Sequence, residues 1–301
     1  MRVAVMTDTN SGISVEEGKK LGVHVIPMPV LIDGQTYYEG VNLAHDEFYR
    51  FMLEGRDVST SQPSPGDVLD MWDGILETHD ALVHIPMSSG LSTTYQTALA
   101  LAADYGGRVQ VADHRSVSVP QRYAVLDALK MAAEGWSAEK IKLTLESAAQ
   151  DTIIYIGVET LEFLKKGGRI TPAAARMGTV LQIKPILQIR GERLDAYAKV
   201  RGTKHSKRRV IEAVKARAAE YERNGEPFVI AAAGSFLKKA EETEWIRMAQ
   251  EAFPGRAIHY DPLAFSIGCH VGPGAFGMAV SKRAPAGNGP TDGKAADGLL
   301  P

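Results

Sequence analysis

The amino-acid sequence predicts an α/β fold with two α/β domains, the first a parallel sheet with helices on both faces and the second a mixed sheet with helices. The chain has 301 residues, which is about twice the usual size of a domain. In the first half, short apolar runs that end in polar residues alternate with helical patterns, as in a parallel sheet covered by helices. In the second half, apolar runs at 183–189 and 193–201 join around Gly191, which predicts an antiparallel pair. We expect domains at 1–155 and 156–283.

The overall composition is that of a globular protein with an ample core. Hydrophobic residues make up 45% and charged residues 23%, and the formal net charge is −2, so no global field attracts nucleic acid or an anionic membrane. The single cysteine, Cys269, excludes an intrachain disulfide and a cysteine-clustered zinc site. The first apolar run is too short for a signal peptide, and none approaches the ~20 residues that span a bilayer. We expect a cytoplasmic protein without a metal or cofactor.

The elements of the first half follow from apolar runs and helix caps. A strand at 3–6 ends in polar residues, and a strand at 23–32 stops at the turn signal Asp33-Gly34. Two helices follow, the first capped by Asn42 and the second by Ser64 with Pro65 at its first position. Beyond them the predicted elements are strands at 81–87 and 108–113 and helices from 95, at 120–134 and at 138–149, the last capped by Ser137.

The second half predicts more strands, some of them antiparallel. A strand at 152–158 leads into a short helix that glycines stop before Arg169, and Thr171-Pro172 begins another helix. After the antiparallel pair come helices around 210–218 and 245–253, strands at 228–233, 257–260 and 276–281, and a glycine-rich loop that contains His270. From residue 284 on, the composition lacks periodicity, so we expect a disordered tail at 284–301.

The segment 88–95 carries five serine or threonine side chains and one glycine between a buried strand and a helix. Free backbone N–H groups, hydroxyl donors and the positive end of a helix can hold an anion. The alternative is that these residues form only a helix cap and a turn. Ligands of parallel sheets bind at the carboxyl ends of the strands. We therefore expect the segments 7–11, 60–61, 88–94 and 113–118 to gather at one sheet edge.

The order and spacing of six motifs resemble the DegV family. The motifs are Thr7-Asp8 and the segments 60–64, 88–96, 161–170, 184–187 and 268–274, so the resemblance covers about residues 1–283. It implies two α/β domains with a fatty acid in a pocket between them. It also implies that the protein is the fatty-acid-binding subunit of a bacterial fatty acid kinase. Such a subunit presents the carboxylate to a separate ATP-using kinase and carries the acyl phosphate away, with a possible transient membrane contact for lipid exchange.

The resemblance also assigns site residues. Thr60 and Ser92 match the hydroxyls that bind the fatty acid carboxylate, and His270 matches a histidine near the carboxyl or phosphoryl group. Arg169 and Arg201 match basic positions that we expect to face outward, toward the acyl phosphate or the kinase. The family usually has glycine after the serine equivalent to Ser92, whereas this chain has Thr93. A β-branched residue would be strained there if the position needs a positive φ.

Each of these residues also has a purely structural interpretation. His270 can be a hydrogen-bonded structural histidine, Arg169 can favour the C-terminus of its helix, and Cys269 can be a packing residue. The basic cluster Lys204, Lys207, Arg208 and Arg209 can be a solvated helix face or, with Arg201, the landing site of an acidic partner.

Two function classes compete with a lipid carrier. The sequence lacks a glycine-rich ATP loop of the G-x-x-x-x-G-K-[ST] type, which favours a carrier without catalysis of its own. The main alternative is an enzyme or kinase subunit that holds a small carbonyl substrate on His270, because the fold is similar to the dihydroxyacetone-binding subunit of dihydroxyacetone kinases. A ligand-sensing regulator would need a DNA-binding element, and the sequence does not predict one.

Overall fold

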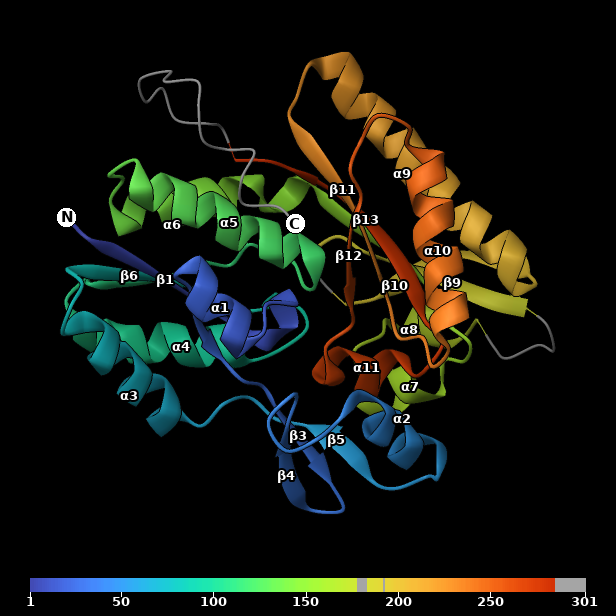
Figure 1. Ribbon diagram of the computed structural model, residues 1–301, viewed down its shortest axis with the longest axis horizontal. Helices are drawn as coiled ribbons and strands as arrows, with labels where there is room; N and C mark the ends of the chain where they lie inside the picture. Colours follow the sequence, from blue (N-terminus) through green and yellow to red (C-terminus); the bar gives the residue numbers. More distant parts are fainter. Residues whose placement is uncertain (178–182, 192, 285–301) are drawn as a thin grey trace.

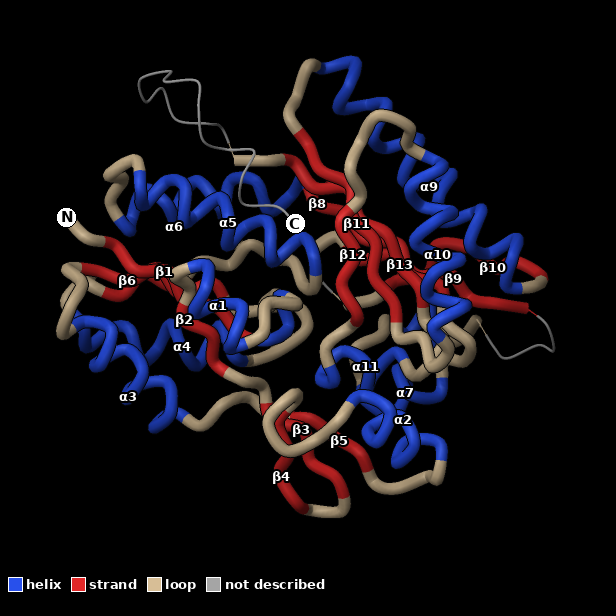
Figure 2. The backbone as a smooth tube through the Cα atoms, viewed as in Figure 1, coloured by secondary structure: helices blue, strands red, loops and turns tan. Residues whose placement is uncertain are grey.

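The computed structural model describes residues 1–177, 183–191 and 193–284. Its strands form three separate sheets (Figure 2). The first is a parallel sheet in the order β2-β1-β6-β7, formed by β1 (Val3–Asp8), β2 (His24–Ile26), β6 (Ala81–Ile85) and β7 (Val109–Val111). This sheet confirms the predicted architecture of the first half.

Helices cover both faces of the parallel sheet. Successive residues of a strand point to opposite faces, and here the side chains on both faces are mostly apolar and need to be buried. Val5 and Val83 pack against α5 (Val119–Ala133) and α6 (Ala138–Ala148). Met6 and Leu82 pack against α3 (Pro65–Leu76) and α4 (Thr94–Ala102) on the other face (Figure 1). A further helix, α1 (Val15–Leu21), lies on the α5 side, and the short 3-10 helices are η1 (Thr9–Ser11), η2 (Ala103–Tyr105) and η3 (Ala149–Asp151).

The second sheet is mixed, as predicted, with the order β10-β9-β8-β13-β11-β12. Its strands are β8 (Thr152–Gly157), β9 (Ile183–Ile189), β10 (Asp195–Arg201), β11 (Phe228–Gly234), β12 (His259–Pro262) and β13 (Phe276–Lys282). The strand β12 pairs with β11 in parallel, and the other described pairings of this sheet are antiparallel. One face is covered by α9 (Thr203–Asn224) and α10 (Lys239–Ala252), and the other face points toward α5.

A third, antiparallel sheet differs from the prediction. The sequence predicts one strand at 23–32, but the structure divides this segment between β2 and β3 (Pro29–Ile32), which belong to different sheets. Pro27 and Pro29 lie at the break, and proline cannot donate to a sheet ladder. The strand β3 pairs with β4 (Gln35–Tyr38) and β5 (Val58–Thr60). Thr60 therefore ends a strand of this small sheet instead of lying on the parallel sheet.

Helix starts agree with the predicted caps at three of four positions. The side chains of Ser64, Ser137 and Thr171 accept from backbone N–H groups in the first turns of α3, α6 and α8 (Pro172–Ala175). The predicted cap Asn42 is wrong. The helix α2 (His45–Leu53) begins after Ala44, and Asn42 instead accepts from the backbone N–H of Tyr38.

The glycine-rich segment around His270 is helical at its start, which corrects the prediction of a loop. The helix α11 (Phe265–Val271) contains His270 in its last turn and packs beside α7 (Glu162–Gly167) and α2. A Cβ at Gly268 would lie 2.4 Å from the Tyr49 hydroxyl oxygen, so glycine permits this close packing. The local sequence does not predict this helix, because the close packing at Gly268 involves α2, which is distant in sequence.

The domain division at residue 155 stays a proposal, and β8, which contains that residue, belongs wholly to the six-stranded sheet. The predicted disordered tail lies, from residue 285 on, outside the described residues. Among the helices that the structure describes, none is long and apolar enough to cross a bilayer.

Candidate functional site

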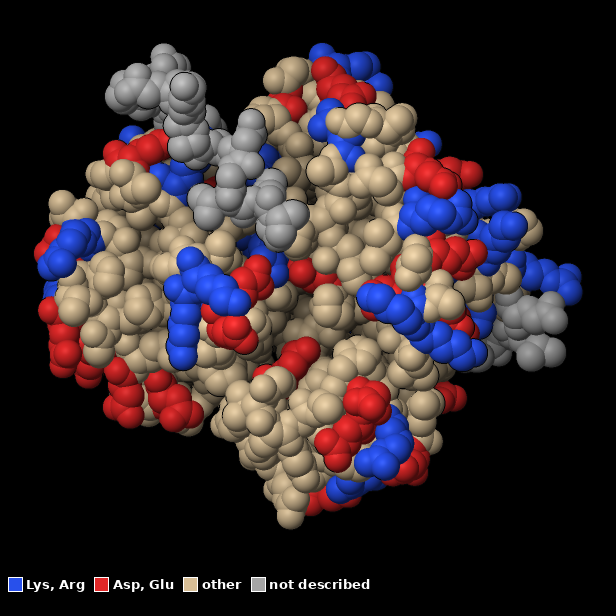
Figure 3. Space-filling view, viewed as in Figure 1, with Lys and Arg blue, Asp and Glu red and all other residues tan. Residues whose placement is uncertain are grey.

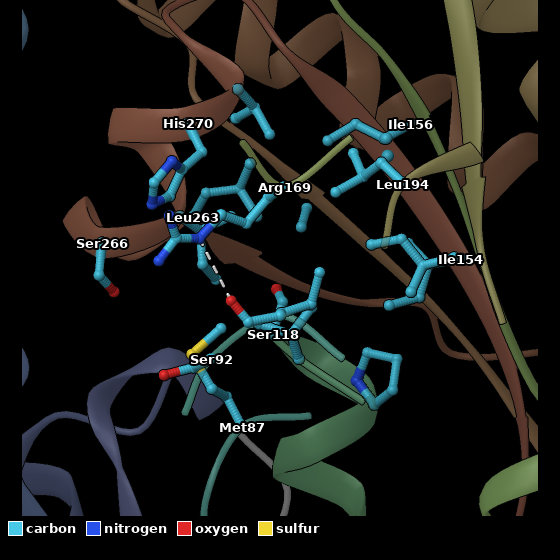
Figure 4. A pocket seen from close by; sticks show the side chains of 18 of the residues that line it. Met87, Ser92, Ser118, Ile154, Ile156, Arg169, Leu194, Leu263, Ser266 and His270 are labelled. Atoms are coloured by element: carbon cyan, nitrogen blue, oxygen red, sulfur yellow. Dashed lines mark hydrogen bonds between the residues drawn. The ribbon is translucent and has the colours of Figure 1, made fainter. Parts of the chain in front are cut away.

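A cavity of about 400 Å³ lies between the loops of the parallel sheet and one face of the six-stranded sheet. Most of its walls are apolar. The first half contributes Met87, Leu91, Val117, Val119 and Pro120, and the second half contributes Ile154, Ile156, Leu164, Ile189, Leu194 and Leu263, among others. Figure 4 shows Ser92, Ser266 and His270 together on one side of the cavity and Ile154 and Ile156 on the opposite side. The cavity thus has one polar end.

Four of the five predicted site residues meet at this polar end. Thr60, Ser92, Arg169 and His270 all line the cavity, although they come from four different segments. The Thr60 hydroxyl lies 3.1 Å from His270 Nε2, a hydrogen bond between residues that are 210 positions apart. The predicted convergence of the Thr60 and Ser92 segments is therefore present in the structure.

The segment after β5 is tied to α4 through Gln62. Its side-chain oxygen accepts from the hydroxyls of Thr93 at 3.3 Å and Thr97 at 3.0 Å. Ser92 sits just ahead of α4, where its hydroxyl accepts from the backbone N–H of Thr94 at 3.2 Å and lies 2.8 Å from the Thr94 hydroxyl. Thr93 has φ of −81°, an ordinary value for a β-branched residue. The position that usually holds glycine in the family therefore needs no glycine here.

His270 is a neutral imidazole at physiological pH. Burial, and to a smaller extent the nearby Arg169, lowers its pKa from 6.5 to about 4. Its Nδ1 atom is buried without a hydrogen-bond partner among the described residues. The ring also packs against Gly167, where a Cβ would lie 2.0 Å from Nδ1. Any side chain at position 167 would displace the imidazole.

Arg169 is half-buried and lines the cavity rather than facing outward. Its Nε donates to the carbonyl of Leu91 at 3.3 Å, and its Nη1 donates to the carbonyl of Gly167. These two bonds use two of the five N–H donors of the guanidinium. Arg169 thus braces the residue before Ser92 and brings a positive charge to the polar end.

Arg201 lies apart from the other four residues. It is exposed at the end of β10, opposite Ile183, and it does not line the cavity. The neighbouring basic cluster on α9 is partly neutralised, since the buried Lys207 pairs with Glu244 at 2.9 Å and Arg209 with Glu212 at 3.6 Å. Lys and Arg side chains gather over α9 among acidic ones in Figure 3.

Sequence reasoning missed three polar residues near this end. Ser118 and Ser266 line the cavity, and Asn10 joins them, because its Oδ1 accepts from the Ser266 hydroxyl and its carbonyl from the Ser118 N–H. Ser118 has φ of +60°, a strained value for a residue with a side chain. The polar segments 7–11 and 113–118 signalled Asn10 and Ser118, whereas nothing local marked Ser266.

Loops of the parallel sheet do meet at one edge, as expected. Besides the bond from Ser118 to Asn10, the Ser88 N–H donates to the Ser116 carbonyl at 2.9 Å. Within 1–177, 183–191 and 193–284, no group of three or more His, Cys, Asp and Glu side chains is placed to hold a metal ion.

This fold and this cavity define a class of α/β protein in which an apolar pocket ends at hydroxyl, imidazole and guanidinium groups. The chain belongs to the DegV family, since the family model described as "Uncharacterised protein, DegV family" matches residues 2–283.

Similar proteins span almost the whole chain. A DegV domain-containing protein of Deinococcus radiodurans is 32% identical over 281 residues, which cover 93% of this chain and 98% of the relative. A solved DegV family protein of Thermus thermophilus, described by its fatty acid binding, is 30% identical with a TM-score of 0.83 and covers 94% of this chain and 100% of its own. DegV of Bacillus subtilis, described as a fatty acid binding protein, is 27% identical with a TM-score of 0.81 and the same coverage.

Proposed function

We propose that this protein binds a long-chain fatty acid in the cavity and presents its carboxylate to a separate ATP-dependent kinase, which forms the acyl phosphate. The observation that carries this proposal is the apolar cavity of about 400 Å³ with Thr60, Ser92, Arg169 and His270 at one end. The fatty acid binding of the Thermus thermophilus and Bacillus subtilis relatives supports it.

The apolar walls supply most of the affinity. A chain of ~14 methylenes at roughly 0.8 kcal/mol each gains on the order of 11 kcal/mol before the costs of association. The hydroxyls of Thr60 and Ser92 each add about 1 kcal/mol, and their larger effect is to fix the direction of the carboxyl group. If the protein lacked these two hydroxyls, the fatty acid would still bind, but its carboxyl group would be poorly oriented.

Phosphoryl transfer requires positive charge that simple binding does not. The acyl phosphate places several negative charges at the polar end, which Arg169 can offset from inside the cavity. We assign Arg201, outside the cavity, to contact with the kinase. The protein is in this proposal a cytoplasmic carrier subunit without an ATP site, and it exchanges its lipid through transient membrane contact.

Mass spectrometry of the purified protein tests this function. Native mass spectra should show the protein with a bound ligand, and organic extraction should remove that ligand. The extract should contain a long-chain fatty acid. Incubation with an ATP-dependent fatty acid kinase should then yield the acyl phosphate. A carbonyl compound attached covalently to His270 would instead support the alternative, an enzyme or kinase subunit for a small carbonyl substrate.

A further inference from the structure

The cavity lies over an unusual part of the six-stranded sheet. Its two neighbouring strands β11 and β13 present alanine or glycine to the cavity at four positions, which we call the small-residue floor: Ala231, Ala233, Gly277 and Ala279. These residues are direct cross-strand partners, Ala233 with Gly277 and Ala231 with Ala279. The floor therefore consists of two rows of small side chains that run across the strands.

Most side chains on the opposite face of the same strands are larger, with Ala232 as an exception. Intervening residues of the same strands, such as Ile230, Met278 and Val280, point to the other face and pack under α9 and α10. Successive residues of a strand alternate between faces, so the two faces are filled independently. One face is filled by its own side chains, while the other leaves space over the small-residue floor.

The rows define a direction away from the polar end. Gly277 lies near the start of β13, which follows α11 in the chain, and beside the end of β8 that leads to α7. Its partner Ala233 lies next to it on β11, and Ala279 and Ala231 lie one row further. Ile156 and Ile154 of β8 flank the two rows as partners of Gly277 and Ala279. Rows on one face are about 7 Å apart, and the second row follows the first along the strands, the direction in which we expect an extended alkyl chain to run.

The next row closes this path. It contains Val229, Ser281 and Thr152, and none of these lines the cavity. The side chains of Thr152 and Ser281 are buried, and their hydroxyls lie 2.7 Å apart, so they form a hydrogen bond with each other. The cavity thus ends where the small side chains end.

We propose that the small-residue floor sets the length of the acyl chain that this protein accepts. This inference rests on the proposed function, since it requires a fatty acid whose carboxyl group is at the polar end. The alkyl chain lies along β11 and β13 over the two rows, and its methyl end stops at the row of Val229 and Ser281. Side chains of the second row, Ala231 and Ala279, are then the residues that determine specificity.

Variants of the second row test the proposal in both directions. Ala231→Val and Ala279→Leu fill the far part of the floor, so each methylene they exclude should lower affinity about fourfold, or about 0.8 kcal/mol. Ile154→Ala opens the same region and should shift the preference to longer acids. The delipidated full-length protein is titrated with laurate, myristate, palmitate and stearate, and the four dissociation constants give a length profile.

A matched control separates chain length from stability. Ala198→Val adds the same two carbons on β10, where Ala198 packs on the α9 side of the sheet, and should leave the length profile unchanged. Melting temperatures of all variants show whether each is folded. The mild Ala231→Val keeps the test valid if the larger Ala279→Leu does not fold.

Two outcomes would contradict the proposal in distinguishable ways. If the wild type binds the acids but the folded Ala231→Val and Ile154→Ala proteins keep its length profile, the small-residue floor does not determine the length of the acyl chain. If the wild type binds none of the four acids, the proposed function itself is wrong, and the inference with it.

Discussion

At the scale of single residues, the polar end of the cavity combines neutral donors with one cation. Thr60 and His270 form a hydrogen bond of 3.1 Å, and burial keeps the imidazole neutral. Ser92 adds one hydroxyl, which lies 2.8 Å from the Thr94 hydroxyl. Neutral hydrogen bonds orient a ligand but add little affinity, whereas Arg169 supplies the charge that a phosphorylated ligand needs.

Replacement of Ser92 tests this separation of roles. Ser92→Ala removes one neutral hydrogen bond, so we expect a loss of about fivefold in fatty acid affinity. We expect a larger loss in the rate at which a kinase forms the acyl phosphate, because the carboxyl oxygen is no longer directed. Ser92→Thr retains the hydroxyl and should restore most of the rate. If the rate of acyl phosphate formation were the same with Ser92→Ala as with the wild type, the Ser92 hydroxyl would not orient the carboxyl group.

The low pKa of His270 predicts a dependence of stability on pH. Its pKa is about 4 in the folded protein, whereas the ordinary value of a histidine is 6.5, so the unfolded state binds more protons between these values. The contribution to the free energy of unfolding is therefore complete above pH 6.5 and is lost as the pH falls toward 4. His84 and His114, with pKa values lowered by burial to about 3 and 4, act in the same direction.

The variant His270→Gln isolates this contribution. We expect its free energy of unfolding, measured with urea at pH 7 and pH 5, to fall less on acidification than that of the wild type, since the other two histidines are present in both proteins. Equal losses would show that His270 is accessible to protons in the folded state.

At the scale of elements, α11 connects the small antiparallel sheet to the cavity. It carries Ser266 and His270 toward the cavity, and on its other side Phe265 stacks on Phe48 of α2 with ring centroids 4.4 Å apart. Both phenylalanines are almost fully buried. The small sheet and α2 therefore hold the helix that positions the histidine.

Phe48→Ala should accordingly affect both stability and binding. Loss of a buried phenylalanine costs about 3–5 kcal/mol, which urea unfolding would measure. Fatty acid affinity should fall as well, because α11 loses its support. A stable variant with unchanged affinity would mean that α11 is held from the cavity side alone.

The two arginines on different elements should behave differently. Arg169 lines the cavity at its polar end, so Arg169→Ala should reduce phosphorylation far more than lipid binding, whereas Arg201 at the exposed end of β10 should matter only to the contact with the kinase. We expect Arg201→Ala to keep the dissociation constant for fatty acid and to raise the carrier concentration that half-saturates the kinase. Loss of lipid binding in Arg201→Ala would contradict this assignment.

At the scale of the whole molecule, a buried ionic cluster joins a helix on the parallel sheet to the six-stranded sheet. Arg122 of α5 donates to Asp261 of β12 at 2.7 Å, to Glu17 of α1 at 2.6 Å and to the Gly12 carbonyl at 2.9 Å. Arg122 and Asp261 are 6% and 8% exposed, so removal of one partner would leave a buried charge uncompensated.

Arg122→Met should therefore destabilise the protein by about 3–5 kcal/mol. Lysine cannot replace the planar guanidinium at such a site, so Arg122→Lys should recover little. Chemical unfolding measures both variants. The double variant Arg122→Met with Asp261→Asn should be less destabilised than the sum of the single changes, and simple additivity would contradict the coupling.

Local sequence signals predict those parts of this molecule that depend on local chemistry. The caps Ser64, Ser137 and Thr171 and the antiparallel pair around Gly191 are of this kind. The failures have a common physical cause, because they depend on contacts between distant segments. Gly268 is set by the approach of Tyr49, and the half-buried orientation of Arg169 is set by the Leu91 carbonyl.

The same distinction holds for the site. The hydroxyls of Thr60 and Ser92 stand out in the sequence, but their meeting depends on Gln62, which binds the Thr93 and Thr97 hydroxyls. The small-residue floor cannot be predicted from the sequence, because Ala231 and Ala279 become neighbours only when β11 and β13 pair.

A crystal structure of the protein with bound palmitate tests the central claim most directly. The account predicts carboxylate oxygens within hydrogen-bond distance of the Thr60 and Ser92 hydroxyls, and an alkyl chain that runs over Ala233 and Ala231. A palmitate whose carboxylate lies away from these two hydroxyls, or whose chain lies outside the cavity, would contradict it.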